Sequence, residues 1–305
     1  MHIESIKISL FSTKMQIKYT FSGHDTFICK HFWLKKGYDF VNTENKFTGE
    51  SAVVSLGVGK NMVSAIRYWL KAFGLTDEND KRRKIADYLF GENGKDSFVE
   101  DIGTIWLLHY LLVKTGKASL YSLFFNEFIR KRRIESFTKP QLHDFLKLKC
   151  EQENTIYNEN TINRDITTFL NNYIRSNKEK SNIEDNFVGL LVELDLVKKI
   201  AYKDDDAYEI IIDNKEDLPY EIVLFSILDQ IESYGNSISF NLLLNADNAP
   251  GRIFVLSAEG LYEKIEEITK KYPTIVYSET AGNKELQFKE SFNKFEILDA
   301  YYKSI

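Results

Sequence analysis

The sequence has few cysteines and prolines and no long apolar run. Two cysteines, Cys29 and Cys150, are too few for a disulfide framework and fit a reducing compartment. Only 4 prolines and 14% aromatic residues exclude a disordered or proline-rich chain. The longest apolar stretches, such as residues 105–113, are too short for a membrane span, and no signal-peptide pattern opens the chain. We therefore expect a soluble cytoplasmic protein without disulfides.

Charge is distributed unevenly along the 305 residues. The formal net charge of −5 argues against a nucleic-acid binder if the chain is taken as a whole. Residues 60–84, however, carry seven Lys or Arg against three acidic residues, and residues 128–150 carry seven against two. Residues 203–217 have the opposite balance, two against seven. This asymmetry is compatible with a basic face for a polyanion, although charge runs are most often solvated helix ends and loops.

Residues 50–73, ESAVVSLGVGKNMVSAIRYWLKAF, have the pattern of a helix-turn-helix. A first helix from Glu50 to Leu56 would end at Gly57, where glycine adopts a positive φ at little cost, and a second helix would begin near Lys60. Apolar residues fall where the two helices must pack, with Val58 in the turn. The similar string Gly-Val-Gly-Lys is not a phosphate-binding loop, because Val54 and Asn61 stand where that motif needs Gly and Ser or Thr.

The second helix of this unit would present one polar face. Donor and mixed donor–acceptor side chains recur there three or four residues apart, facing a phosphate backbone and a major groove: Lys60, Asn61, Ser64, Arg67 and Lys71. Three further arginines complete the predicted DNA-binding set: Arg82 and Arg83, close in sequence, and Arg164 on a later helix. A purely structural helix-turn-helix that only packs against its neighbours is the alternative.

Upstream of this unit, residues 19–40 are rich in aromatics, and Ser22 or Asp25 could cap a helix there. His24, Asp25, Cys29 and His31 lack the spacing of known metal motifs, so capping and packing roles are favoured and no metal site is predicted. Downstream, helices are expected at 81–90, from Asp101 to residue 113, and at 120–129.

Two later segments have the element order of a winged helix, three helices and a β-hairpin. In the first, Thr138 would cap a helix reaching Lys149, Asn160 or Thr161 would cap the next, and residues 187–194 would form the third. Its hairpin would pair residues 196–202 with 208–212 across an acidic tip. The second has helices at 220–233 and 258–271, the latter capped by Ser257, an apolar run at 242–244, a hairpin of 275–278 with 287–288, and a terminal helix at 292–302.

The predicted fold is mainly α (α+β), built from serial helix-turn-helix or winged-helix units with short hairpins. We predict four segments: an N-terminal extension over 1–14, a helical domain over 15–135, and winged-helix-like domains over 136–217 and 218–305.

The sequence also resembles a bacterial and archaeal family known as domain of unknown function 4007. The resemblance covers nearly everything after Met15 and is carried by FSGHDTF, WLKKGYD, AVVSLGVGKNMVSAIRYW, LFGENGKD, FNEF, NRDITTFL, PGRIF and ETAG. It implies genes that neighbour sulfotransfer-type reductases in DNA-modification and phage-defence clusters. Asp25, Lys30 and Ser64 depart from the usual Glu, Arg and Arg, and the last departure removes a cation from the predicted recognition face.

We weigh three classes of function for this sequence. We expect a non-enzymatic DNA-binding accessory protein, with double-stranded DNA and other subunits of a modification or defence system as partners. A protein–protein adaptor is the alternative, favoured by the net negative charge and the acidic hairpin. No paired carboxylates, activated nucleophile or metal spacing rise above chance, so no enzyme activity and no cofactor are predicted.

Overall fold

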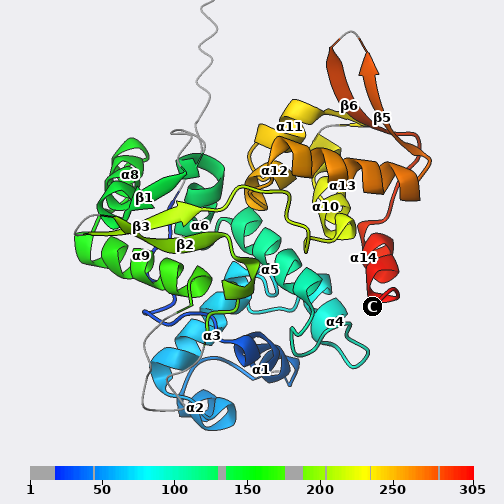
Figure 1. Ribbon diagram of the computed structural model, residues 1–305. Coiled ribbons are helices and arrows are strands. Elements are labelled where there is room, and N and C mark those ends of the chain that lie inside the picture. Colours follow the sequence, from blue (N-terminus) through cyan, green and yellow to red (C-terminus); the bar gives the residue numbers. More distant parts are fainter. Residues whose placement is uncertain are drawn as a thin grey trace, which may run out of the picture.

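The computed structural model describes residues 18–43, 45–129, 135–175, 188–202, 205–233, 235–280 and 282–305. The predicted extension 1–14 and the basic run 130–133 lie outside these residues. The described chain is mainly helical with two small antiparallel sheets, as predicted (Figure 1). None of the described helices combines the length and apolar character needed to cross a membrane.

The first part of the chain is helical. Its elements are α1 (His31–Asn42), α2 (Glu50–Leu56), α3 (Lys60–Ala72), α4 (Lys84–Phe90), α5 (Ile102–Thr115), α6 (Ser119–Leu123) and the π-helical turn η1 (Phe124–Phe128). Helix α5 is buried on nearly all sides, as its apolar sequence requires, and Asp101 caps it by accepting from the Thr104 amide at 3.0 Å.

The second part contains a helix pair and a three-stranded sheet. Its elements are β1 (Ser136–Thr138), α8 (Lys139–Gln152), α9 (Glu159–Tyr173), the 3₁₀ turn η3 (Val192–Leu194), β2 (Val197–Tyr202) and β3 (Asp205–Ile210). The strand order is β1-β3-β2, all antiparallel, with Phe137 opposite Tyr208 and Lys199 opposite the same tyrosine. Thr138 and Gln141 form a capping box at the start of α8.

The third part repeats this order of elements. It comprises α10 (Tyr220–Leu228), the 3₁₀ turn η4 (Ile231–Ser233), β4 (Ser237–Ser239), α11 (Phe240–Asn245), α12 (Pro250–Ile253), α13 (Ala258–Lys271), β5 (Ile275–Thr280), β6 (Asn283–Phe288) and α14 (Lys294–Tyr302). Its sheet has the order β4-β6-β5, the counterpart of the first sheet. This repetition agrees with the predicted pair of hairpin-bearing units, while their winged-helix identity and the domain boundaries stay predictions.

A continuous apolar core joins these parts, and α14 returns to pack on the first part (Figure 1). The Tyr301 hydroxyl donates to Asp101 at 2.8 Å, and the Thr104 and Tyr302 hydroxyls lie 2.6 Å apart. The C-terminal helix thereby covers the start of α5.

The FSGHDTF segment, residues 21–27, packs closely between α3 and α9. Gly23 lies against the Tyr68 ring, where an added Cβ would come within 2.2 Å, and the Ser22 amide donates to Asp165 at 2.8 Å. Ser22 and Asp25 have positive φ angles and cap no helix, because helix α1 begins only at His31. The predicted cap at either residue is therefore wrong.

Two further sequence predictions are corrected. Asn158, not Asn160 or Thr161, caps α9, since its side chain accepts from the Thr161 amide at 2.9 Å. Residues 188–194 form turns and a 3₁₀ helix instead of an α-helix, because the Leu190 amide donates to the Cys29 carbonyl at 3.1 Å and Gly189 forms a β-bridge with Lys30. Strands β1 and β4 are three residues each and carry too little alternation to be recognised from sequence.

Candidate nucleic-acid interface

The two helices and the turn that the sequence predicts are present as α2, residues 57–59 and α3. Gly57 ends α2 in the left-handed conformation with φ 60°, and the amides of Gly57 and Val58 donate to Val54 and Val53 at 3.2 and 3.3 Å, a Schellman motif. A small core holds the two helices together: Phe40, Ala52, Leu56 and Val63 are buried, with Phe47, Val53 and Val58 packed against them. The turn and the second helix therefore have the local geometry that the spacing predicts.

Replacing Gly57 by valine is expected to destabilise the protein by about 1 kcal/mol or more, because a β-branched residue is strained at positive φ. Space is not the obstacle, since an added Cβ at this position meets no atom within 4 Å. Gly57→Asn is the matched control, because asparagine enters the left-handed region far more readily. Thermal unfolding followed by circular dichroism tests this, and equal melting temperatures for the two variants would contradict it.

The N-terminal half of α3 presents polar side chains to solvent. Lys60, Asn61 and Ser64 are all exposed, and the Ser64 hydroxyl donates back to the Lys60 carbonyl at 3.4 Å. Neither Lys60 nor Asn61 has a side-chain hydrogen bond or ion pair with any residue that the structure describes. These three residues form the part of the predicted face that is available to a ligand.

The C-terminal half of α3 is occupied by an acidic residue of its own chain. Asp80 receives two hydrogen bonds from Arg67 Nε, at 2.9 and 3.0 Å, and one from Arg67 Nη2 at 2.7 Å. Lys71 Nζ lies 3.0 Å from the same carboxylate and donates to the Glu78 carbonyl at 2.7 Å. Although burial opposes ionisation, the hydrogen bonds and charges of Arg67 and Lys71 hold the pKa of Asp80 below its usual value.

Arg67, Lys71 and Asp80 form a cluster, here called the Asp80 cluster, in which two cations contact the two oxygens of one carboxylate. Arg67 binds this carboxylate in a bidentate manner, the geometry in which arginine also binds phosphate. The sequence interpretation missed Asp80, although the acidic stretch at 77–80 follows the end of α3 after only four residues. A positive φ of 62° turns Asp80 back toward the helix, and no periodic pattern reports such a turn.

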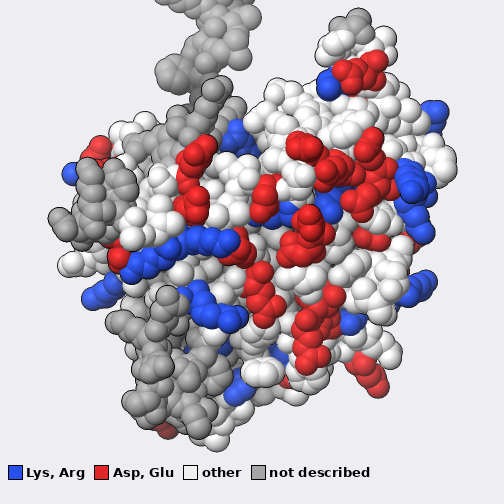
Figure 2. Space-filling view, in the orientation of Figure 1, with Lys and Arg blue, Asp and Glu red and all other residues white. Residues whose placement is uncertain are grey.

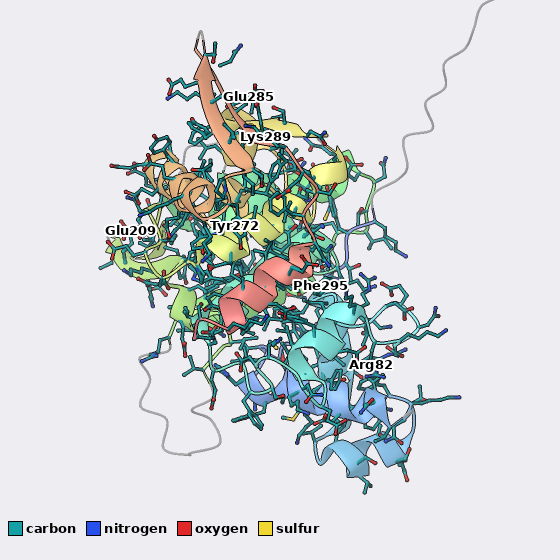
Figure 3. The ribbon with its side chains drawn as sticks, turned by 90° about the vertical axis from the view of Figure 1, so that its right-hand side faces the viewer. Arg82, Glu209, Tyr272, Glu285, Lys289 and Phe295 are labelled. Atoms are coloured by element: carbon teal, nitrogen blue, oxygen red, sulfur yellow. The ribbon has the colours of Figure 1, made fainter. Side chains whose placement is uncertain are left out.

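The three remaining predicted arginines come from elements other than α3. Arg82 pairs with Asp87 and donates to the Tyr38 hydroxyl at 2.9 Å, with its guanidinium 5.4 Å from the tyrosine ring centre. Figure 3 places Arg82 beside α4 and α1. Arg83 is exposed at the N-terminus of α4, and Arg164 is exposed on α9. The charge of Arg83 helps to hold the pKa of Glu78 below its usual value, and the Glu78 carbonyl accepts from Lys71, so Arg83 lies near the C-terminal half of α3.

The histidine and cysteine side chains near the N-terminus have packing roles. His24 is buried and stacks on Trp69 with ring centres 5.5 Å apart, and its Nε2 lies 3.4 Å from Asp165. Cys29 is buried, and burial raises the pKa of its thiol well above the usual value. Among the described ranges, no three His, Cys, Asp or Glu side chains are grouped so as to hold a metal ion.

A comparison with models of known protein families shows which family this chain belongs to. The family model described as "Protein of unknown function (DUF4007)" matches residues 21–302. The chain is a member of the DUF4007 family. The match begins at the FSGHDTF segment and ends in α14, so the DUF4007 unit includes both sheets as well as helices α2 and α3. No curated protein matches this DUF4007 chain.

Two solved structures share the fold of this DUF4007 protein. "Magnesium ion-bound SspB crystal structure" is 26% identical, with a TM-score of 0.81, and "SspB crystal structure" is 27% identical, with a TM-score of 0.79. Each alignment covers 93% of this chain and 88% of the other. The DUF4007 protein is therefore similar to SspB over nearly its full length.

Proposed function

We propose that this protein is a non-enzymatic accessory protein of a DNA-modification or phage-defence system and that it binds double-stranded DNA through α2 and α3. The observation that carries the proposal is the exposed polar start of α3, with Lys60, Asn61 and Ser64 following a well-formed left-handed turn. In helix-turn-helix proteins the N-terminal residues of the second helix contact base edges. Lys60 suits a phosphate or guanine, and Asn61 suits adenine.

The Asp80 cluster supplies two further cations in this proposal. Arg67 and Lys71 lie one and two turns beyond Ser64 on the same helix, and their side chains are partly exposed. A phosphate would compete with Asp80 for them. Their contribution therefore depends on breaking a bidentate arginine–carboxylate pair that a second cation supports, an arrangement worth more than the about 0–1 kcal/mol of an ordinary exposed ion pair. Asp80 thus limits how much the two cations add to the affinity for DNA.

An adaptor that binds partner proteins is the second candidate. It is favoured by the same ion pairs, which neutralise Arg67 and Lys71, and by the net charge of −5. Acidic side chains also gather over α13 in the view of Figure 2. Subunits of the same modification or defence system would be the partners.

A gel-shift titration on modified and unmodified duplexes at two salt concentrations tests the DNA-binding proposal. Replacing Lys60, Arg67 and Lys71 together by alanine is expected to weaken binding and to flatten the plot of log affinity against log salt by roughly 0.9 for each phosphate that is no longer neutralised. Asn61→Ala should instead change the preference between sequences more than the salt slope. Circular dichroism confirms that each variant is folded.

The outcomes separate the candidates. A folded triple variant with the affinity and salt slope of the parent would contradict DNA binding by α3 and favour the adaptor. Because one similar structure is magnesium-bound, the titration is run with and without Mg²⁺. The products are also resolved on a denaturing gel, where cut strands would contradict the non-enzymatic part of the proposal.

A further inference from the structure

A second cationic surface lies between α9 and the β2–β3 hairpin. A groove of about 820 Å³ opens there, and its charged lining comprises four cations and two carboxylates: Lys139, Arg175, Lys198, Lys199, Asp195 and Asp206. Figure 1 shows α9 running alongside the hairpin, and Figure 2 shows Lys and Arg side chains gathered in a band over the same region. The volume falls in the range of ligand sites, about 300–1,000 Å³.

The groove carries more positive than negative charge. Lys198 and Lys199 pair with its two carboxylates, Asp195 and Asp206, at 2.6 and 2.7 Å, and all four side chains are about half exposed. Ion pairs this exposed contribute little and exchange readily with another anion. Two more cations at the groove, Lys139 and Arg175, make no ion pair with any residue in the described ranges.

The wall formed by α9 adds uncharged hydrogen-bonding groups. Asn163, Thr167 and Asn171 are exposed and follow one another at intervals of four residues, so they lie on one side of the helix, with Arg164 beside them. Below them the groove is floored by apolar side chains, including Leu170 and Ile174. Cations that neutralise phosphates, next to amides and hydroxyls on one helix face, are the usual composition of a nucleic-acid contact surface.

We propose that this groove binds the sugar–phosphate backbone of nucleic acid and forms a second contact surface, separate from α3. The inference rests on the proposed function in one respect only, namely that the ligand is the same duplex. Phosphates displace Asp195 and Asp206 from Lys198 and Lys199, while Lys139 and Arg175 contact the backbone directly.

Fluorescence anisotropy with one labelled duplex, measured at several salt concentrations, tests the groove. Lys139→Ala with Arg175→Ala is expected to weaken binding by about tenfold near 0.1 M salt for each phosphate that is no longer neutralised, and to reduce the salt slope by about 0.9 per phosphate. The control with the same charge change is Lys270→Ala with Lys271→Ala, two exposed lysines at the end of α13, which should bind as the parent does.

A second pair of variants changes only Asn171, an exposed residue, so that a loss of folding does not decide the result. Asn171→Glu places a negative charge in the groove and should weaken binding, whereas Asn171→Gln keeps the side chain neutral and should not. Unchanged binding by the double alanine variant and by Asn171→Glu would overturn the inference, and an acidic protein segment would become the occupant to test.

The same measurement on Lys60→Ala with Asn61→Ala separates this inference from the proposed function. Weaker DNA binding in the groove variants alone would support the groove as a contact surface and contradict DNA binding by α3. Weaker binding in the α3 variant alone would support the proposed function and overturn the groove.

Discussion

Replacing Asp80 by asparagine is expected to raise the affinity for duplex DNA by roughly tenfold at 0.1 M salt for each phosphate that Arg67 or Lys71 then neutralises, and to steepen the salt dependence by about 0.9 per phosphate. Asp80 holds both cations in the unbound protein, at 2.7 and 3.0 Å. Asparagine removes the competing charge, and it tolerates the positive φ of this position. The two cations then meet a phosphate without first breaking an ion pair.

The measurement is an anisotropy titration over a range of salt concentrations. Glu92→Gln is the matched control, because Glu92 is exposed and has no ion pair with any part of the chain that the structure describes. It removes one negative charge from the same part of the sequence without freeing a cation. An Asp80→Asn protein that behaves like Glu92→Gln would show that Arg67 and Lys71 do not reach the DNA, and the proposed interface would shrink to Lys60, Asn61 and Ser64.

Replacing His109 by alanine is expected to destabilise the protein by about 3–5 kcal/mol, the range for removing a large buried ring. His109 is fully buried on α5 and joins three parts of the chain. Its Nε2 donates to the Ile253 carbonyl at 2.7 Å, so Nδ1 accepts from the Tyr173 hydroxyl at 2.9 Å. Alanine leaves a cavity and two buried groups without partners.

The same histidine makes stability depend on pH. Burial lowers the pKa of His109 from 6.5 to about 4, while the hydrogen bond to Ile253 opposes the shift. Between pH 4 and pH 6.5 the imidazole of His109 is protonated in the unfolded chain and neutral in the folded protein. The free energy of unfolding therefore falls as the pH falls from 6.5 to 4, by up to about 3 kcal/mol for this group.

Urea unfolding at several pH values tests both effects. His109→Gln retains a donor and an acceptor but does not titrate, so its stability should change less between pH 6.5 and 4 than that of the parent. His31→Ala, at a half-buried position on α1, is the control for removal of an imidazole and should cost much less than His109→Ala. Equal pH dependence in the parent and in His109→Gln would show that His109 is not the titrating group.

Local patterns in the sequence were sufficient to predict helices α2 and α3, the turn between them and most helix caps. Gly57, the apolar spacing of α2 and α3, the capping box of Thr138 and the cap at Ser257 all act within a few residues. Such signals arise from backbone sterics and from hydrogen bonds between near neighbours, and they leave a readable spacing. The mainly α fold and the two hairpins follow from the same kind of information.

The surface that a ligand would meet was decided only by the tertiary structure. Asp80 turns back onto Arg67. Lys139, Arg175 and Lys198 line one groove. His109 joins α5 to Tyr173 and Ile253, which are 64 and 144 positions further along the chain. Contacts over such separations depend on how the helices pack, and they impose no periodicity on the segments that make them. The sequence by itself thus determined which helix presents polar residues, while the fold of the chain after α3 decided which of them remain available, because Asp80 forms ion pairs with Arg67 and Lys71.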